Sequence, residues 1–160
     1  MGDNHVPFKK ARILCLGVAR NCEQTIAEEV NRLKNAFQGV LALEHYVVES
    51  DSSDGTVEIL TRLARQNTHF SFKTFGALRT SIPKRTERLA YCRNEYVRYA
   101  RERHQLCKFD YVVVADLDGI NAELTSEAVE SCWARDDWDA CFANQRGPYY
   151  DIWALRHPWW

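Results

Sequence analysis

Short apolar runs alternate with amphipathic segments along this chain, and that alternation limits the folds open to it. Residues 13–19 form a nearly continuous apolar run, which is typical of a strand covered on both faces. Apolar residues then recur at helical spacing, at Ile26, Val30, Leu33 and Phe37. The same change of period, from strand to helix, repeats down the chain. This order predicts a parallel sheet with helices packed on it.

The expected elements follow from these periods and from the turn residues between them. Asn21 is an expected N-cap, with Gln24 three residues later as in a capping box, and Gly39 closes that first helix. Further strands are expected at 46–48, 70–72, 111–115 and 140–143, with helices at 57–64, 84–104 and 123–134. The fold class is therefore α/β, with a mostly parallel sheet flanked by helices in a single domain, residues 1–160.

Composition narrows the possible partners. The 160 residues carry a formal net charge of -1, which gives no sign of a nucleic-acid-binding or membrane-surface protein. No run approaches the roughly 20 apolar residues that span a bilayer, and the charged start of the chain does not resemble a signal peptide. The six cysteines form no CxxC pair, so we expect reduced thiols in a cytoplasmic protein, with Cys15 and Cys141 in buried strands.

Polar clusters follow three of the expected strands. They are Arg20-Asn21, the segment 49–56 and the segment 116–121. Ligands of open α/β sheets bind outside the carboxyl ends of the strands, where such clusters meet. The topology thus predicts one polar site at this edge of the sheet.

Asp116 and Asp118 flank one residue directly after a buried strand. Two carboxylates so close repel each other unless a cation or proton lies between them. Hard divalent cations prefer oxygen ligands and keep phosphate oxygens in their shell, which suits a diphosphate substrate. The pattern favours an Mn²⁺ or Mg²⁺ site, although both acids would also serve as helix caps or solvent-exposed groups.

A second enzyme class fits the same residues less well. Asp116-Leu117-Asp118-Gly119 also resembles the nucleophile motif of haloacid-dehalogenase-type phosphatases, in which the first Asp attacks phosphorus. That motif usually lies on the first strand of its domain and continues with Thr or Val. Here Ile120 follows, and about three expected strands precede it.

The long helix at 84–104 carries two arginines of interest. On a helical projection Arg93 falls inside an apolar arc between Ala90 and Val97, and Arg88 falls at its edge. A guanidinium on such a stripe needs an anionic partner or a polar site. We therefore expect Arg93 to be mostly buried, either in a structural ion pair or beside a substrate.

Three segments together resemble the GT-A glycosyltransferases. Residues 47–56 (VVESDSSDGT) are similar to the nucleotide-binding turn of that fold. Residues 85–94 (RTERLAYCRN) and 149–153 (YYDIW) resemble more narrowly the fungal capsule-associated α-1,3-mannosyltransferases and their bacterial relatives. The resemblance covers roughly residues 10–157, and it implies a GT-A-like, Rossmann-like architecture.

The resemblance also implies roles for individual residues. Arg20 and Glu49 would contact the nucleoside, Asp116 the ribose and the metal, and Asp118 the metal and the diphosphate. Further residues are assigned to the nucleotide-sugar site, namely Ala19, Asp51 and Arg88.

Asp151 and Arg93 are the predicted catalytic residues, and Asp151 would lie near the donor sugar or the acceptor. The implied reaction moves a hexosyl group, with mannose from GDP-mannose as the first candidate, to a hydroxyl of a glycan or lipid-linked sugar with retention of configuration.

All five tryptophans lie in the last 28 residues, and the chain ends on Trp159-Trp160. Such an apolar end predicts a missing partner surface, so we expect the chain to be incomplete at its C-terminus. The alternative to an enzyme is then a non-catalytic remnant that keeps the donor pocket and lacks the acceptor half.

Overall fold

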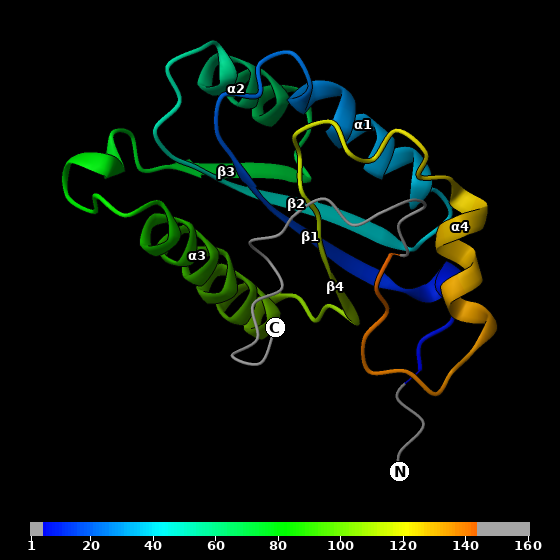
Figure 1. Ribbon diagram of the computed structural model, residues 1–160. Coiled ribbons are helices and arrows are strands. Elements are labelled where there is room, and N and C mark those ends of the chain that lie inside the picture. The colour runs from blue at the N-terminus through cyan, green and yellow to red at the C-terminus, as the bar shows by residue number, and fades with distance from the viewer. Residues whose placement is uncertain (1–4, 144–160) are drawn as a thin grey trace, which may run out of the picture.

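The sheet contains four parallel strands, in a computed structural model that describes residues 5–143 (Figure 1). The strands are β1 (Arg12–Ala19), β2 (Ala42–Glu49), β3 (Phe70–Thr74) and β4 (Tyr111–Val114). Their order in the sheet is β3-β2-β1-β4. The chain therefore moves outward from β1 to β3 and then crosses back to place β4 on the other side of β1. The predicted α/β class and mostly parallel sheet are confirmed.

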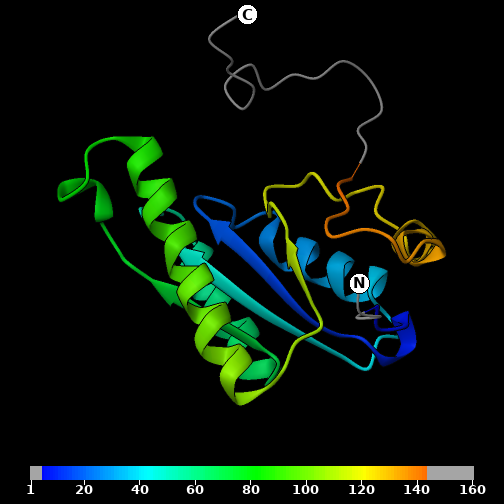
Figure 2. The same ribbon diagram turned by 90° about the horizontal axis from the view of Figure 1, so that it is seen from below.

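Helices cover both faces of this sheet (Figures 1 and 2). On one face lies α3 (Arg85–Leu106), and on the other lie α1 (Ile26–Ala36) and α2 (Thr56–Gln66), with α4 (Ser126–Ser131) beside α1. The short 3-10 turns are η1 (Phe8–Lys10), η2 (Leu78–Thr80) and η3 (Cys132–Ala134). None of the helices within residues 5–143 is long and apolar enough to cross a membrane.

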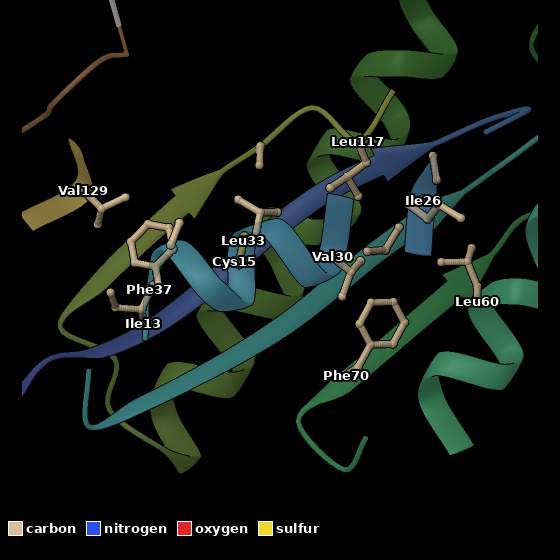
Figure 3. Close-up of a cluster of buried hydrophobic side chains, with 14 of the residues drawn as sticks. Ile13, Cys15, Ile26, Val30, Leu33, Phe37, Leu60, Phe70, Leu117 and Val129 are labelled. Atoms are coloured by element: carbon tan, nitrogen blue, oxygen red, sulfur yellow. The ribbon is translucent and has the colours of Figure 1, made fainter. Parts of the chain in front are cut away.

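Alternation along β1 divides the core into two layers. Ile13 and Cys15 belong to the layer that packs under α1, α2 and α4, whereas Leu14 and Leu16 belong to the layer under α3. Figure 3 shows the first layer, in which Leu33 and its neighbours from α1 lie over the strands. Because both faces of this central strand are covered from Ile13 to Leu16, the run 13–19 is continuously apolar rather than alternating.

One expected strand is wrong, and one expected helix is shorter than expected. Residues 140–143 form no strand and are exposed, Phe142 to 87%, so Cys141 is not buried in a strand. A run of four apolar residues does not by itself distinguish a strand from an apolar loop. The helix expected at 123–134 is only α4 followed by η3, because Thr125 accepts a hydrogen bond from Ala128 N and caps α4 there.

The expected start of the first helix is also wrong. Asn21 is not its N-cap, since α1 begins at Ile26 after Thr25. Asn21 instead has a φ of 49°, in the left-handed region, and its side chain accepts a hydrogen bond from Ser53 N at 2.8 Å. The residue therefore stabilises a contact between two loops.

His45 on β2 is a buried group without a hydrogen-bond partner. Neither ring nitrogen is satisfied by any of the residues 5–143, and the ring lies 6.2 Å from that of Phe70. Burial, with a smaller contribution from the charge of Lys34, lowers the pKa of His45 from 6.5 to about 4. The folded protein therefore holds this imidazole in its neutral form.

The lowered pKa predicts a loss of stability in acid. Between pH 6.5 and about 4 the unfolded chain binds a proton at His45 that the folded chain does not, so the free energy of unfolding should fall as the pH falls through this window. The loss attributable to His45 should reach up to about 3 kcal/mol. Urea unfolding of the wild type and of His45→Leu over pH 4–8 measures it. Parallel pH profiles for the two proteins would contradict the prediction.

Candidate functional site

The candidate site lies where the strand order reverses. Going outward from β1, β2 lies on one side and β4 on the other, so the loops after β1 and β4 leave the sheet side by side. Such a reversal is the usual position of a ligand site in an open α/β sheet. The two loops are residues 20–25 and residues 115–125.

The loop after β4 presents two aspartates around a buried leucine. Asp116 and Asp118 are exposed, whereas Leu117 between them is only 4% exposed. Leu117 packs against Gly17 of β1, where an added Cβ would lie 2.6 Å from Leu117 Cδ1 and 3.1 Å from the Ala115 carbonyl. The glycine therefore makes the space that lets the leucine anchor this acidic loop.

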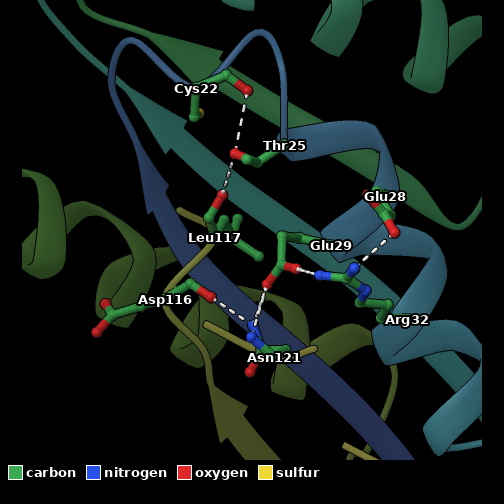
Figure 4. Close-up of polar contacts among 8 residues, drawn as sticks. All are labelled: Cys22, Thr25, Glu28, Glu29, Arg32, Asp116, Leu117 and Asn121. Carbon is green, nitrogen blue, oxygen red and sulfur yellow. Dashed lines mark hydrogen bonds and ion pairs between the residues drawn. The ribbon is translucent and has the colours of Figure 1, made fainter. Parts of the chain in front are cut away.

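Helix α1 and its N-cap residue Thr25 hold the same loop through hydrogen bonds (Figure 4). Thr25 Oγ1 donates to the Leu117 carbonyl at 3.3 Å. Asn121 donates from its backbone N to Glu29 Oε2 at 3.2 Å and from its side-chain amide to the same oxygen. The Asn121 amide also donates to the Asp116 carbonyl at 2.7 Å. The loop is thus fixed at the backbone of Asp116, Leu117 and Asn121 without using the carboxylate of Asp116 or Asp118.

Glu29 is the central residue of this network and is fully buried, at 0% exposure. Its other carboxylate oxygen accepts a hydrogen bond from Arg32 Nη1 at 2.6 Å, and Arg32 also pairs with the exposed Glu28. The sequence did not identify Glu29. Its spacing from Ile26 and Leu33 puts it on the apolar face of the helix, and that spacing was the available signal.

The loops after β1 and β2 are interlocked. Asn21 N donates to Ser52 Oγ at 3.0 Å, and Glu23 N donates to Asp54 Oδ2 at 3.1 Å. Cys22 N donates to Thr56 Oγ1 at 2.9 Å, which in turn donates to Asp54 Oδ1 at 2.6 Å. The polar segment 49–56 therefore serves largely to hold residues 20–25 in place.

The pKa of Asp54 reflects this role. Burial acts to raise the pKa of Asp54, but hydrogen bonds from Thr56 and from the Glu23 N–H outweigh it and lower the pKa below its usual value. The carboxylate is consequently charged at neutral pH and holds both loops.

The predicted nucleotide contacts Glu49 and Asp51 are at the expected edge, but their side chains are buried. Glu49 accepts hydrogen bonds from Ser52 N at 2.9 Å and from Thr74 Oγ1. Asp51 accepts one from Arg79 N at 2.8 Å. Its second oxygen lies 3.0 Å from Arg88 Nε, an ion pair without the angle of a hydrogen bond. Both carboxylates stabilise the loops from inside.

Arg88 is the largely buried arginine of α3, and the expected burial of Arg93 is wrong. The Arg88 side chain is 12% exposed and also donates to the Ile82 carbonyl at 2.9 Å. Arg93 is exposed. The buried stripe of α3 is centred on Cys92 and Tyr96, whereas the expected arc was centred too far toward Ala90 and Val97, which are themselves exposed.

The charges of Arg93 and Asp116 act in opposite directions on Tyr96 of α3. Burial raises the pKa of Tyr96, while the charge of Arg93 lowers it and the charge of Asp116 raises it. Arg20 is exposed at the end of β1, directly after the buried Ala19. The predicted catalytic Asp151 lies outside the described residues.

A cavity of about 350 Å³ opens between these loops. This volume is within the range of small-molecule sites. Of the residues predicted for the site, Asp118 lines it. The full lining is Asn21, Cys22, Glu23, Gln24, Thr25, Asp54 and Asp118.

Few side chains of the candidate site could act as ligands of a metal ion. Across residues 5–143, no group of three or more His, Cys, Asp and Glu side chains is placed to hold a metal ion. Asp116 and Asp118 are both exposed and neither is used in a hydrogen bond by its carboxylate within that range. Two carboxylates suit a cation that takes its other ligands from water and a phosphate group.

Comparisons with known proteins find likeness in structure rather than in sequence. No protein-family model matches the chain, and no curated protein matches it. A solved structure, S. aureus TarS 1-349, aligns with 77% of this chain at 16% sequence identity and a TM-score of 0.47. The chain spans 31% of the length of that structure. Neither the identity nor the TM-score of this match bears on activity.

Replacing Gly17 with alanine should destabilise the protein through the acidic loop. The new Cβ would overlap Leu117 and crowd the Ala115 carbonyl, at a cost of about 1–3 kcal/mol in the free energy of unfolding. Urea unfolding of Gly17→Ala, Leu117→Ala and the double variant measures the coupling. Gly17→Ala should cost less when Leu117 is already shortened. Additive losses would show that the glycine and the leucine do not act on each other.

Glu29→Gln should loosen the same loop. The amide cannot accept charge-assisted hydrogen bonds from both Arg32 and Asn121, so we expect a loss of about 2 kcal/mol in the free energy of unfolding. Glu28→Gln is the matched control, because Glu28 pairs with the same arginine at an exposed position, where a loss below about 0.5 kcal/mol is expected. Amide exchange at Asn121 should also rise in Glu29→Gln. Equal losses in the two variants would contradict a special role for Glu29.

Proposed function

We propose that this chain is the nucleotide-sugar-binding domain of a metal-dependent glycosyltransferase. The observation that carries the proposal is the position of Asp118, which lines the cavity at the reversal between β1 and β4. Asp116 lies beside it on a loop that Glu29 and Thr25 hold in place. A hydrogen-bonded loop with two exposed carboxylates at a strand-end cavity suits a cation-bound diphosphate.

The metal would be held by Asp116 and Asp118. Mn²⁺ or Mg²⁺ fits this pair, because such ions use one or two carboxylates together with water and phosphate oxygens. When bound, the ion supplies positive charge to the diphosphate that leaves in the transfer. The two carboxylates would fix the position of the ion. The hydrogen bonds from Thr25 and α1 would hold the loop that carries these carboxylates while the ion and the diphosphate bind.

The donor would enter from the side of Arg20 and Asn21. Both are exposed at the end of β1, and the arginine offers a planar cation for a phosphate or a base edge. Glu49, Asp51 and Arg88 would act indirectly, by fixing the loops around the donor. Arg93 has an exposed guanidinium on α3, which suits a contact with the diphosphate or the transferred sugar.

The finer assignment follows the resemblance of segments 47–56, 85–94 and 149–153. It is transfer of a hexosyl group, with GDP-mannose as the first donor to test, to a hydroxyl of a glycan or lipid-linked sugar. Asp151 would lie near the transferred sugar or the acceptor. A chain that binds the donor without transferring or hydrolysing the sugar would be the non-catalytic form of the same domain.

Nucleotide binding should depend on both the metal and Asp118. Calorimetric titration of GDP and UDP should show appreciable binding with Mn²⁺ or Mg²⁺ and none in chelator. Asp118→Asn should weaken the metal-dependent affinity about tenfold, which equals about 1.4 kcal/mol, since the amide loses the charge that attracts the cation.

Asp137→Asn is the matched control, because it makes the same change of charge at an exposed residue that pairs with Arg135 rather than lining the cavity. Its affinity should equal that of the wild type. Equal nucleotide affinity in metal and in chelator would refute the metal site. Asp116-dependent hydrolysis of an aryl phosphate would instead favour the dehalogenase-type phosphatase.

A further inference from the structure

Two cysteines lie next to each other outside the candidate site. Cys132 Sγ, in η3, is 3.2 Å from Cys141 Sγ. Cys141 is exposed and Cys132 half-buried, whereas Cys15, Cys22 and Cys92 are buried. All six cysteines of the chain are free thiols in this structure. These two therefore form an accessible pair of thiols at near-contact distance.

The local fold explains the approach of two residues nine positions apart. Trp138 Nε1 donates to the Cys132 carbonyl at 2.7 Å and to the Arg135 carbonyl at 3.0 Å. The chain is thereby turned back on η3. The Trp138 ring packs on Tyr111 of β4 at 5.5 Å and on Trp133 at 5.8 Å. The turn that brings the thiols together thus rests on the same sheet that carries the acidic loop.

We propose that Cys132 and Cys141 are a redox modification site, which closes to an intramolecular disulfide in the presence of a small disulfide such as oxidised glutathione. The Cys141 thiolate attacks one sulfur of the oxidant and releases one glutathione thiolate. The Cys132 thiolate then attacks Cys141 Sγ in the mixed disulfide and releases the second glutathione. Overall, two protein thiols are oxidised, and one molecule of oxidised glutathione is reduced to two of glutathione.

The two thiols have different parts in this sequence. Burial, together with the hydrogen bond and the charge of Cys141, raises the pKa of Cys132 to about 11. A thiol that is hard to deprotonate is a poor first nucleophile. Cys132 is instead suited to the second step, in which the attacked sulfur is already in contact.

The cross-link would close a loop of ten residues, 132–141. It would fix the turn that packs Trp138 on β4 and remove conformational freedom from the unfolded chain. The oxidised protein should therefore melt about 5 °C higher than the reduced protein. A mixed disulfide on a single cysteine closes no loop and should give no such rise.

Peptide mapping tests the proposal directly. Trypsin cleaves after Lys108, Arg135 and Arg146, so Cys132 and Cys141 fall on separate peptides, 109–135 and 136–146. After treatment of the full chain with oxidised glutathione, we expect these peptides to be recovered joined, with a loss of two hydrogens. Melting of the reduced and oxidised samples should show the expected difference.

Cys107→Ser is the matched control, because Cys107 is the remaining cysteine that is not buried, and this variant should still form the cross-link. Cys132→Ser should leave Cys141 as a glutathione adduct, without the rise in melting temperature. Recovery of the wild-type peptides separately, each with glutathione or with a free thiol, would overturn the proposal. So would a joined peptide that contains Cys107.

Discussion

A carboxylate removed from water is costly unless donors and positive charge surround it, and Glu29 is the residue of this fold to which that constraint applies most directly. Its two oxygens require Arg32 on one side and Asn121 on the other. Asn121 also holds the carbonyl of Asp116. Because α1 is at the same time a principal helix of the core, the packing that stabilises the fold also sets the position of the acidic loop.

The loops after β1 and β2 extend the same coupling to the opposite wall of the cavity. Asp54 holds Glu23 N, and Asn21 holds Ser53 N, across more than thirty residues of sequence. Thr25 then connects this wall to Leu117. A ligand that enters the cavity meets groups that are already ordered, so less conformational entropy is lost on binding. Glu49 and Asp51, predicted as nucleotide contacts, hold these loops through hydrogen bonds from Ser52 N and Arg79 N.

Much of the fold was predictable because the period of apolar residues reports burial directly. The four strands and the long α3 were located in this way, and the parallel direction followed from the helices between them. The strand at 140–143 was wrong because a short apolar run has no period to measure. The cap at Asn21 was wrong because a distant residue, Ser53, uses its side chain. Contacts of that kind depend on which loops are adjacent, and the local pattern does not contain that information.

The charged side chains of Arg88 and Glu29 show how far the sequence pattern can predict the candidate site. The rule that a charge on an apolar stripe needs a partner holds in α3, but the stripe centres on Cys92 and Tyr96, so it applies to Arg88 rather than Arg93. The same rule, applied to α1, would have selected Glu29. The identities of the partners are a separate matter, because Asp51 and Asn121 come from loops whose proximity is decided by the strand order. Helical phase can thus indicate that a buried charge is paired, and only the topology of the sheet determines with what.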